Sequence, residues 1–275
     1  MKITTAIVDK TRAYFKPDPE YSFVLDMQFL AFLVGCVAVG LPIVMGIGIL
    51  SGTCFFQSIS HFYYAQFLGS VFVAALVIIG TFLLAYRGES KAETLLATIA
   101  GFSAFAIALF PTEGRGCEEM QYAGRILADQ INVSSASNAV TIAPATELGQ
   151  FFELFPAAGI LHFASALALF SFLAFYSFFI FTRVIDEQRR KDGTITEVKK
   201  LRNKIYIGSG TIIVISILAI GIQALPITDW PWWNENKLTF WFEAAALWAF
   251  GISWMVKGRF YGYLLLDERE RLGRH

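Results

Sequence analysis

The stretch "FPAAGILHFASALALFSFLAFYSFFIF" (155–181) decides the fold of this chain. It contains no Asp, Glu, Lys or Arg, and one histidine, His162. The hydrocarbon core of a bilayer, about 30 Å thick, needs roughly 20 apolar residues of helix to cross it. The stretch therefore predicts a membrane-spanning helix, and it raises the question of what a histidine does there.

Five other segments have the same character, and the composition of the chain agrees. Of its 275 residues, 56% are hydrophobic and only 16% are charged, and the mean hydropathy is +0.55. The six predicted spans are Phe23–Leu50, Phe67–Tyr86, Thr94–Phe110, Ala157–Phe181, Ile205–Leu225 and Leu238–Val256.

These runs predict an all-α integral membrane bundle of six transmembrane helices, forming a single membrane domain over residues 1–275. Helices satisfy their own backbone hydrogen bonds in lipid, and the period-2 alternation of a membrane β-barrel is absent. Residues 1–22 contain no apolar run like that of a cleavable signal peptide. We expect them to form a cytoplasmic segment, with the first helix as the targeting element.

The positions of Lys and Arg predict how the bundle is oriented. With six spans both termini fall on one side, together with the short loops at 87–93 and 182–204 and the tail at 257–275. Only Arg115, Arg125 and Lys237 of the 22 Lys and Arg residues fall on the opposite side. Because basic loops stay in the cytoplasm, we place the N and C termini there, in a bacterial inner membrane.

Three loops then face outward, and the longest spans residues 111–150. A connection of this length usually has its own function or structure. Cys54 lies in the first outward loop and Cys117 in the long one. In an oxidising compartment such a pair is a disulfide candidate, the alternative being two free thiols too far apart to bond.

Ionisable residues at membrane depth are costly and are candidates for function. Those of this chain map to the outward third of the bundle, so we expect a pocket there for a polar lipid headgroup. The ligand-binding candidates are His61, Glu113, Glu153, His162 and Glu243. The alternative is that each histidine is an ordinary buried or interfacial residue that hydrogen-bonds between helices.

A metal site is a more specific form of this hypothesis, because imidazole and carboxylate groups are common ligands of zinc. No helix carries two such ligands at positions i and i+4, and the third histidine, His275, falls on the cytoplasmic side. We therefore predict no metal and no cofactor. The sequence also has no Gly-rich phosphate loop and no nucleophile elbow.

Four phrases of this sequence, in this order, carry a resemblance that covers about residues 27–258. They are "SISHFYYAQFLGSVFVAALVIIGTFLLAYRG" (58–88), "IAGFSAFAIALFPT" (99–112), "LHFASALALFSFLAFYSFFIFTR" (161–183) and "LWAFGISWMVKG" (247–258). The chain resembles a bacterial family of multi-span membrane proteins of unknown function, similar in layout to the six-helix DRAM-like proteins. The resemblance implies a six-helix membrane protein and no particular activity.

A remoter similarity is to the ceramidase and progestin-receptor-like membrane hydrolases, which gather three histidines, a serine and an aspartate round zinc. Ser58 and His61 imitate one fragment of that pattern. This chain lacks the seventh helix and the histidine pair expected on it, so the zinc site is not carried over.

Two classes of function remain open. The first is a non-enzymatic membrane protein that binds lipid headgroups or serves as an accessory subunit of a larger membrane complex. The second is an outward-facing lipid hydrolase or transferase that uses His162 with Glu153 or Glu243, or else a transporter of a lipid-like substrate. The expected partners are membrane lipids and other membrane subunits, and not nucleic acid, since the basic residues are confined to positions beside the membrane.

Overall fold

The computed structural model describes residues 27–112, 131–133, 140–142, 157–184, 193–225 and 230–258. Within these ranges six helices are long and apolar enough to cross a membrane, which confirms the predicted six-helix fold. They are α2 (Met27–Leu50), α3 (Gln66–Ala85), α4 (Lys91–Leu109), α5 (Ala158–Phe175) with its π-helical continuation η3 (Tyr176–Ile180), α6 (Glu197–Gln223) and α8 (Leu238–Lys257).

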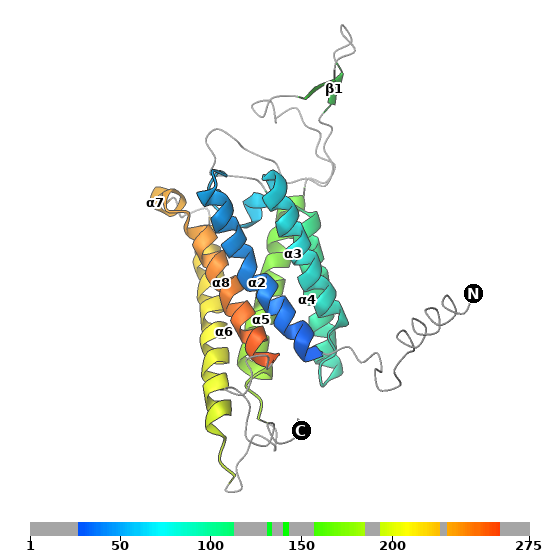
Figure 1. Ribbon diagram of the computed structural model, residues 1–275, viewed down its shortest axis with the longest axis vertical. Coiled ribbons are helices and arrows are strands. Elements are labelled where there is room, and N and C mark those ends of the chain that lie inside the picture. The colour runs from blue at the N-terminus through cyan, green and yellow to red at the C-terminus, as the bar shows by residue number, and fades with distance from the viewer. Residues whose placement is uncertain are drawn as a thin grey trace, which may run out of the picture.

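The six long helices run roughly along one axis (Figure 1), and their contacts form a ring in chain order. Each helix packs on the one that follows it in the sequence, from α2 through α3, α4, α5 and α6 to α8, and α8 closes the ring on α2. Across the ring, α5 and α8 also touch. A ring of helices leaves an interior that side chains must fill, and here they fill it unevenly along its axis.

The first long helix begins where the last one ends. A Cβ added at Gly258, just after α8, would lie 2.6 Å from the carbonyl oxygen of Gln28 in the first turn of α2. An even number of crossings therefore separates these two points. Which end faces the cytoplasm stays a prediction, and the predicted segments 1–22, 111–150 and 257–275 lie almost wholly outside the described residues.

Two helices begin earlier than hydropathy predicts, because polar residues cap them. Ser90 and Glu93 form a capping box at the start of α4: the Ser90 side chain accepts from the Glu93 N–H, and Glu93 Oε2 accepts from the Glu89 N–H. Thr196 caps α6 in the same way by accepting from the Lys199 N–H. The charged residues after Thr196 are good helix formers, so α6 starts eight residues before Ile205.

Three short elements were not predicted. The 3₁₀ helix η1 (Ser60–Tyr64) lies between α2 and α3, and α7 (Pro231–Glu235) precedes α8. A two-stranded antiparallel hairpin pairs β1 (Ile131–Val133) with β2 (Val140–Ile142), with Asn132 opposite Thr141. The end of the bundle with η1 and α7 is called the η1 end below.

The opposite end, called the basic end, carries Arg87, Lys91, Arg183 and Lys257 at helix termini. There Arg183 Nη1 donates to Glu93 Oε1 over 2.6 Å, and the Tyr176 hydroxyl donates to the Glu93 carbonyl over 2.8 Å. The bond with Glu93 raises the pKa of the Arg183 guanidinium above its ordinary value. These contacts join the start of α4 to the end of α5.

Aromatic side chains fill the ring toward the basic end. Trp254 of α8 is fully buried, and aromatic rings from α3, η3 and α8 pack round it. Phe82 meets it edge-on with centroids 5.0 Å apart, and Tyr176 stacks on it at 6.4 Å. The cluster closes the interior of the bundle on that side.

A pair of glycines lets α2 and α8 approach closely. A Cβ on Gly251 would lie 2.6 Å from the Gly35 carbonyl oxygen, and a Cβ on Gly35 would lie 2.7 Å from that of Gly251. Small residues at such crossings allow backbones to touch in membranes. Gly40, five residues further along α2, has nothing within 4 Å of its added Cβ.

Replacing Gly251 by Ala should lower the free energy of unfolding by about 1–3 kcal/mol, because two backbones must separate to admit the methyl group. The matched control is Gly40→Ala, which adds a methyl group to open space in a helix. Reversible unfolding in mixed micelles measures both variants. Equal stability of the two variants would contradict the close crossing.

Candidate functional site

The segment before α3 folds back onto the η1 end of the bundle. Its 3₁₀ turns form because the Ser58 carbonyl accepts from the His61 N–H (3.2 Å) and the Ser58 hydroxyl oxygen accepts from the Ser60 N–H (3.0 Å). Serine favours such side-chain turns. Phe62 is fully buried and anchors the segment, with its ring 5.0 Å from that of Phe56.

Glu243, in the second turn of α8, holds this segment in place. The Ser58 hydroxyl donates to its carboxylate over 2.8 Å, and the Ile59 N–H donates to Oε2 over 2.6 Å. One turn earlier, the Phe240 N–H donates to the Gln57 carbonyl over 2.9 Å. Bonds to a carboxylate are among the strong hydrogen bonds of proteins, so Glu243 fixes the position of Ser58 and its neighbours.

His162, in the second turn of α5, has two hydrogen-bond partners and is only 2% exposed. Its Nδ1 lies 2.9 Å from the carbonyl oxygen of Phe110, and its Nε2 lies 3.1 Å from the Ser60 hydroxyl oxygen. A carbonyl oxygen can only accept, so the network places the imidazole proton on Nδ1. Nε2 of the neutral ring then accepts from Ser60.

These bonds form one continuous network across the η1 end. It runs from Glu243 on α8 through Ser58 and Ser60 to His162 on α5, and from there to the end of α4. Neither Ser58 nor Ser60 was among the predicted ligand residues, although Ser60 makes the contact with His162. It is separated from His162 by 102 residues, and no local spacing pattern predicts their contact.

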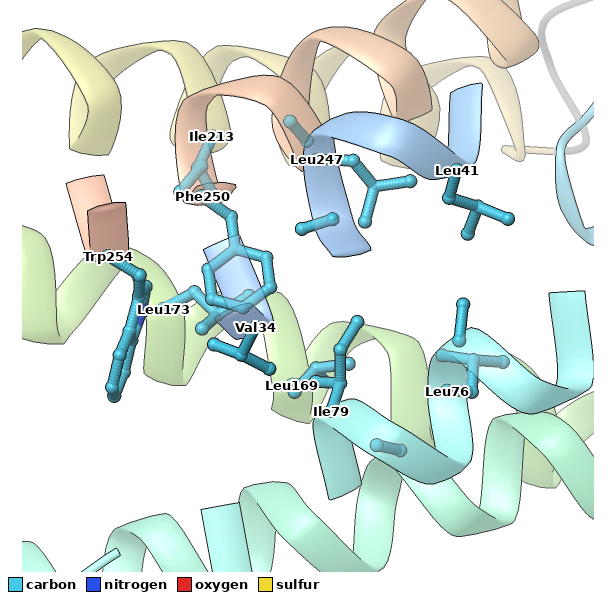
Figure 2. Packing of buried hydrophobic residues seen from close by; sticks show 14 of the residues in the cluster. Val34, Leu41, Leu76, Ile79, Leu169, Leu173, Ile213, Leu247, Phe250 and Trp254 are labelled. Atoms are coloured by element: carbon cyan, nitrogen blue, oxygen red, sulfur yellow. The ribbon is translucent and has the colours of Figure 1, made fainter. Parts of the chain in front are cut away.

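The network lies at one end of a cavity of about 820 Å³ enclosed by the ring. Figure 2 shows Leu41 and Leu247 facing Leu76 and Ile79 across the interior. Below the network the walls are almost wholly apolar. They come from all six long helices, and they are interrupted by Ser216 of α6.

The cavity reaches the lipid-facing surface between α5 and α6. The wall residues on α5 include Ile160 and Phe163, which are 74% and 60% exposed, and those on α6 include the exposed Gly221 and Ala224. Exposed wall residues on two neighbouring helices mark an opening in the side of the bundle. Ile160 and Phe163 are apolar, so the rim of this opening on α5 is apolar.

The residues that line the cavity include no Lys, Arg or Asp, and Glu243 is the one acidic residue among those that the structure describes there. Elsewhere too, the described ranges contain no group of three or more His, Cys, Asp or Glu residues that could hold a metal ion. The arrangement suits hydrogen bonding to hydroxyl and carbonyl groups rather than binding of charged groups.

Three of the five predicted ligand residues line this cavity: His61, His162 and Glu243. The other two, Glu113 and Glu153, lie outside the described residues. His162 and Glu243 bond to different partners, Ser60 and Ser58, so the network joins them through the serines. The binding of a ligand by these residues stays a prediction.

No protein-family model, no curated protein and no solved structure matches this chain. The similarity to the DRAM-like layout therefore rests on the phrases quoted above and stays a prediction. The structure itself shows six helices that are long and apolar enough to cross a membrane, within the residues that it describes.

The predicted disulfide pairs Cys54 with Cys117, and Cys117 lies outside the described residues. Cys36, within α2, is a free thiol. We expect peptides of the unreduced protein to include a Cys54–Cys117 cross-link, detected by mass spectrometry and lost after reduction. Full alkylation of Cys117 without prior reduction would contradict the pairing.

Proposed function

We propose that this membrane protein binds a neutral lipid, with the acyl chain in the cavity and the polar head at the Glu243–Ser58–Ser60–His162 network. The observation that carries the proposal is the asymmetry of the cavity. Its body is apolar, and its polar side chains gather at the η1 end. An amphiphile with one apolar tail matches this distribution.

The cavity is long enough to hold the acyl chain of a lipid from one leaflet of a bilayer. Along α5 its walls run from Gly159 to Leu173, which at 1.5 Å per residue is about 21 Å. Half of a hydrocarbon core of about 30 Å is shorter than this. A lipid from one leaflet can therefore enter through the α5–α6 opening with its tail in apolar surroundings throughout.

The chemistry of the polar end favours an uncharged head. A phosphate needs Lys, Arg or several N–H donors, and no Lys or Arg is among the described cavity residues. Glycerol hydroxyl and ester groups can instead bond to the serine hydroxyls and to His61. Mono- and diacylglycerols have this chemistry.

The hydroxyl of Ser216 supports the proposal that a bound molecule extends deeper into the cavity. It is 1% exposed, lines the cavity, and has no hydrogen-bond partner in the described part of the chain. Buried polar groups are nearly always hydrogen-bonded. A second oxygen of the lipid, or a water molecule held with it, would satisfy this hydroxyl.

Within the described part of the chain, aromatic side chains occupy the ring toward the basic end, and this favours binding over transport. The Trp254 cluster fills the ring there with rings packed 5.0–6.4 Å apart. The role of an accessory subunit in a larger complex stays a prediction.

The proposed location is a bacterial inner membrane, with the basic end in the cytoplasm and the lipid site in the outer leaflet. The support is the charge asymmetry, since Lys and Arg are the residues that hold loops in the cytoplasm. Membrane lipids are then the immediate partners.

Protein purified in a mild detergent should carry a neutral acylglycerol, detected by native mass spectrometry and identified after extraction. The variants Leu76→Trp and Ala166→Trp place an indole in the cavity and should each lower the bound fraction at least fivefold. Leu218→Trp is the matched control, because Leu218 lies on the lipid-facing side of α6, outside the cavity.

Thermal unfolding of the same samples shows that each variant is folded. Equal lipid loading of the cavity variants and of Leu218→Trp would overturn the proposed site. Loading by a phospholipid alone would overturn the neutral head.

Orientation has its own test in alkaline phosphatase fusions, which are active only outside the cytoplasm. A fusion after Gly258 should be inactive, and one after Glu235 of α7 should be active. The opposite pattern would place the site in the inner leaflet.

A further inference from the structure

We infer that Ser60 and His162 form a nucleophile–base pair that cleaves an acyl ester of the bound lipid. This inference rests on the proposed function, since it needs a lipid in the cavity. It assigns a reaction to a contact that the binding of a lipid alone does not require.

The contact has the geometry of an activated serine. Ser60 Oγ lies 3.1 Å from Nε2 of His162, within the range for a hydroxyl that gives its proton to a base. The Phe110 carbonyl, 2.9 Å from Nδ1, holds the imidazole proton on the far side of the ring. The lone pair of Nε2 is thereby aimed at the Ser60 hydroxyl.

Hydrogen bonds to residues outside the pair fix the orientation of both side chains. His162 is 2% exposed and bonded on both nitrogens, so its ring has one position. Ser60 is held through its own N–H by Ser58, which Glu243 holds in turn. Ser58 and Glu243 are therefore positioning residues, and they keep Ser60 at the base.

The pair stands where an ester group would lie. Ser60 and His162 both line the cavity at its polar end, next to apolar walls long enough for an acyl chain. A lipid whose tail fills those walls brings its ester carbonyl to the polar end. Positioning of this kind supplies much of the rate of an acyl transfer.

The reaction balances with water as the second reactant. Ser60 Oγ attacks the ester carbonyl carbon, and its proton passes to His162 Nε2. The bond from that carbon to the alcohol oxygen breaks, and the leaving alcohol takes the proton from Nε2. Water then attacks the acyl-serine and gives its proton to Nε2, and Ser60 leaves with that proton as the fatty acid departs.

The test uses an alkyl fluorophosphonate on the full-length protein in micelles. An activated Ser60 bonds to phosphorus and expels fluoride, and intact mass with peptide mapping locates the adduct. We expect one adduct per chain, on Ser60, and none in Ser60→Ala. His162→Gln should slow labelling by about 10²-fold or more, the usual range for loss of a general base.

The matched control is Ser103→Ala, which should label at the wild-type rate. Ser103 is also a buried serine, but its hydroxyl donates to the Ile99 carbonyl of its own helix, 2.9 Å away, and it does not line the cavity. Release of fatty acid from monoacylglycerol by the wild type, and not by Ser60→Ala, is the second readout.

Native mass spectra of the same samples separate this inference from the proposed function. Lipid bound by the wild type, together with labelling of Ser60 that His162→Gln slows, supports both. Lipid retained by the wild type without labelling of Ser60 overturns the catalytic pair and leaves the binding site. Absence of lipid from the wild type overturns the binding site itself, and labelling on another serine overturns the role of Ser60.

Discussion

The carboxylate of Glu243 is the acceptor on which the η1 end of the bundle depends. The chain before α3 buries a serine hydroxyl and a backbone N–H, and both donate to this one group. Buried donors without partners cost about 1–3 kcal/mol each. With Glu243 in place the segment lies across the top of the ring, and Ser60 meets His162 as a result.

The two ends of the ring are built on different principles. Toward the basic end, Gly35 and Gly251 bring α2 and α8 together, and rings close round Trp254. Toward the η1 end the walls carry leucine and isoleucine side chains that leave about 820 Å³ unfilled. Tight packing at one end gives the helices a fixed arrangement, and this allows a cavity at the other.

Most of the fold could be predicted from the sequence, because hydrocarbon thickness imposes a length on every span. The predicted starts of α4 and α6 were three and eight residues too late, since hydropathy detects the apolar run and not the capping residue. The signal was present in Ser90-x-x-Glu93 and in Thr196. Helix-capping residues considered together with hydropathy predict the start of both helices.

The candidate site was predicted only in outline. Ionisable side chains are energetically costly in a membrane, and this makes His61, His162 and Glu243 candidates. These three residues line the cavity. Ser60 could not be predicted in this way, because a serine side chain carries no charge and occurs in helices and loops alike. Its partner His162 is also distant in the chain. Which polar groups meet depends on how the first loop folds back, and no periodicity in the sequence encodes that.

The opening between α5 and α6 determines how the protein meets its ligand. A molecule that arrives through the side of the bundle never passes through water, so its supply is set by its mole fraction in the surrounding leaflet. Dilution of the whole sample would leave occupancy unchanged, whereas added inert lipid would lower it. Apparent affinities for this protein are therefore surface quantities, comparable only between membranes of known composition.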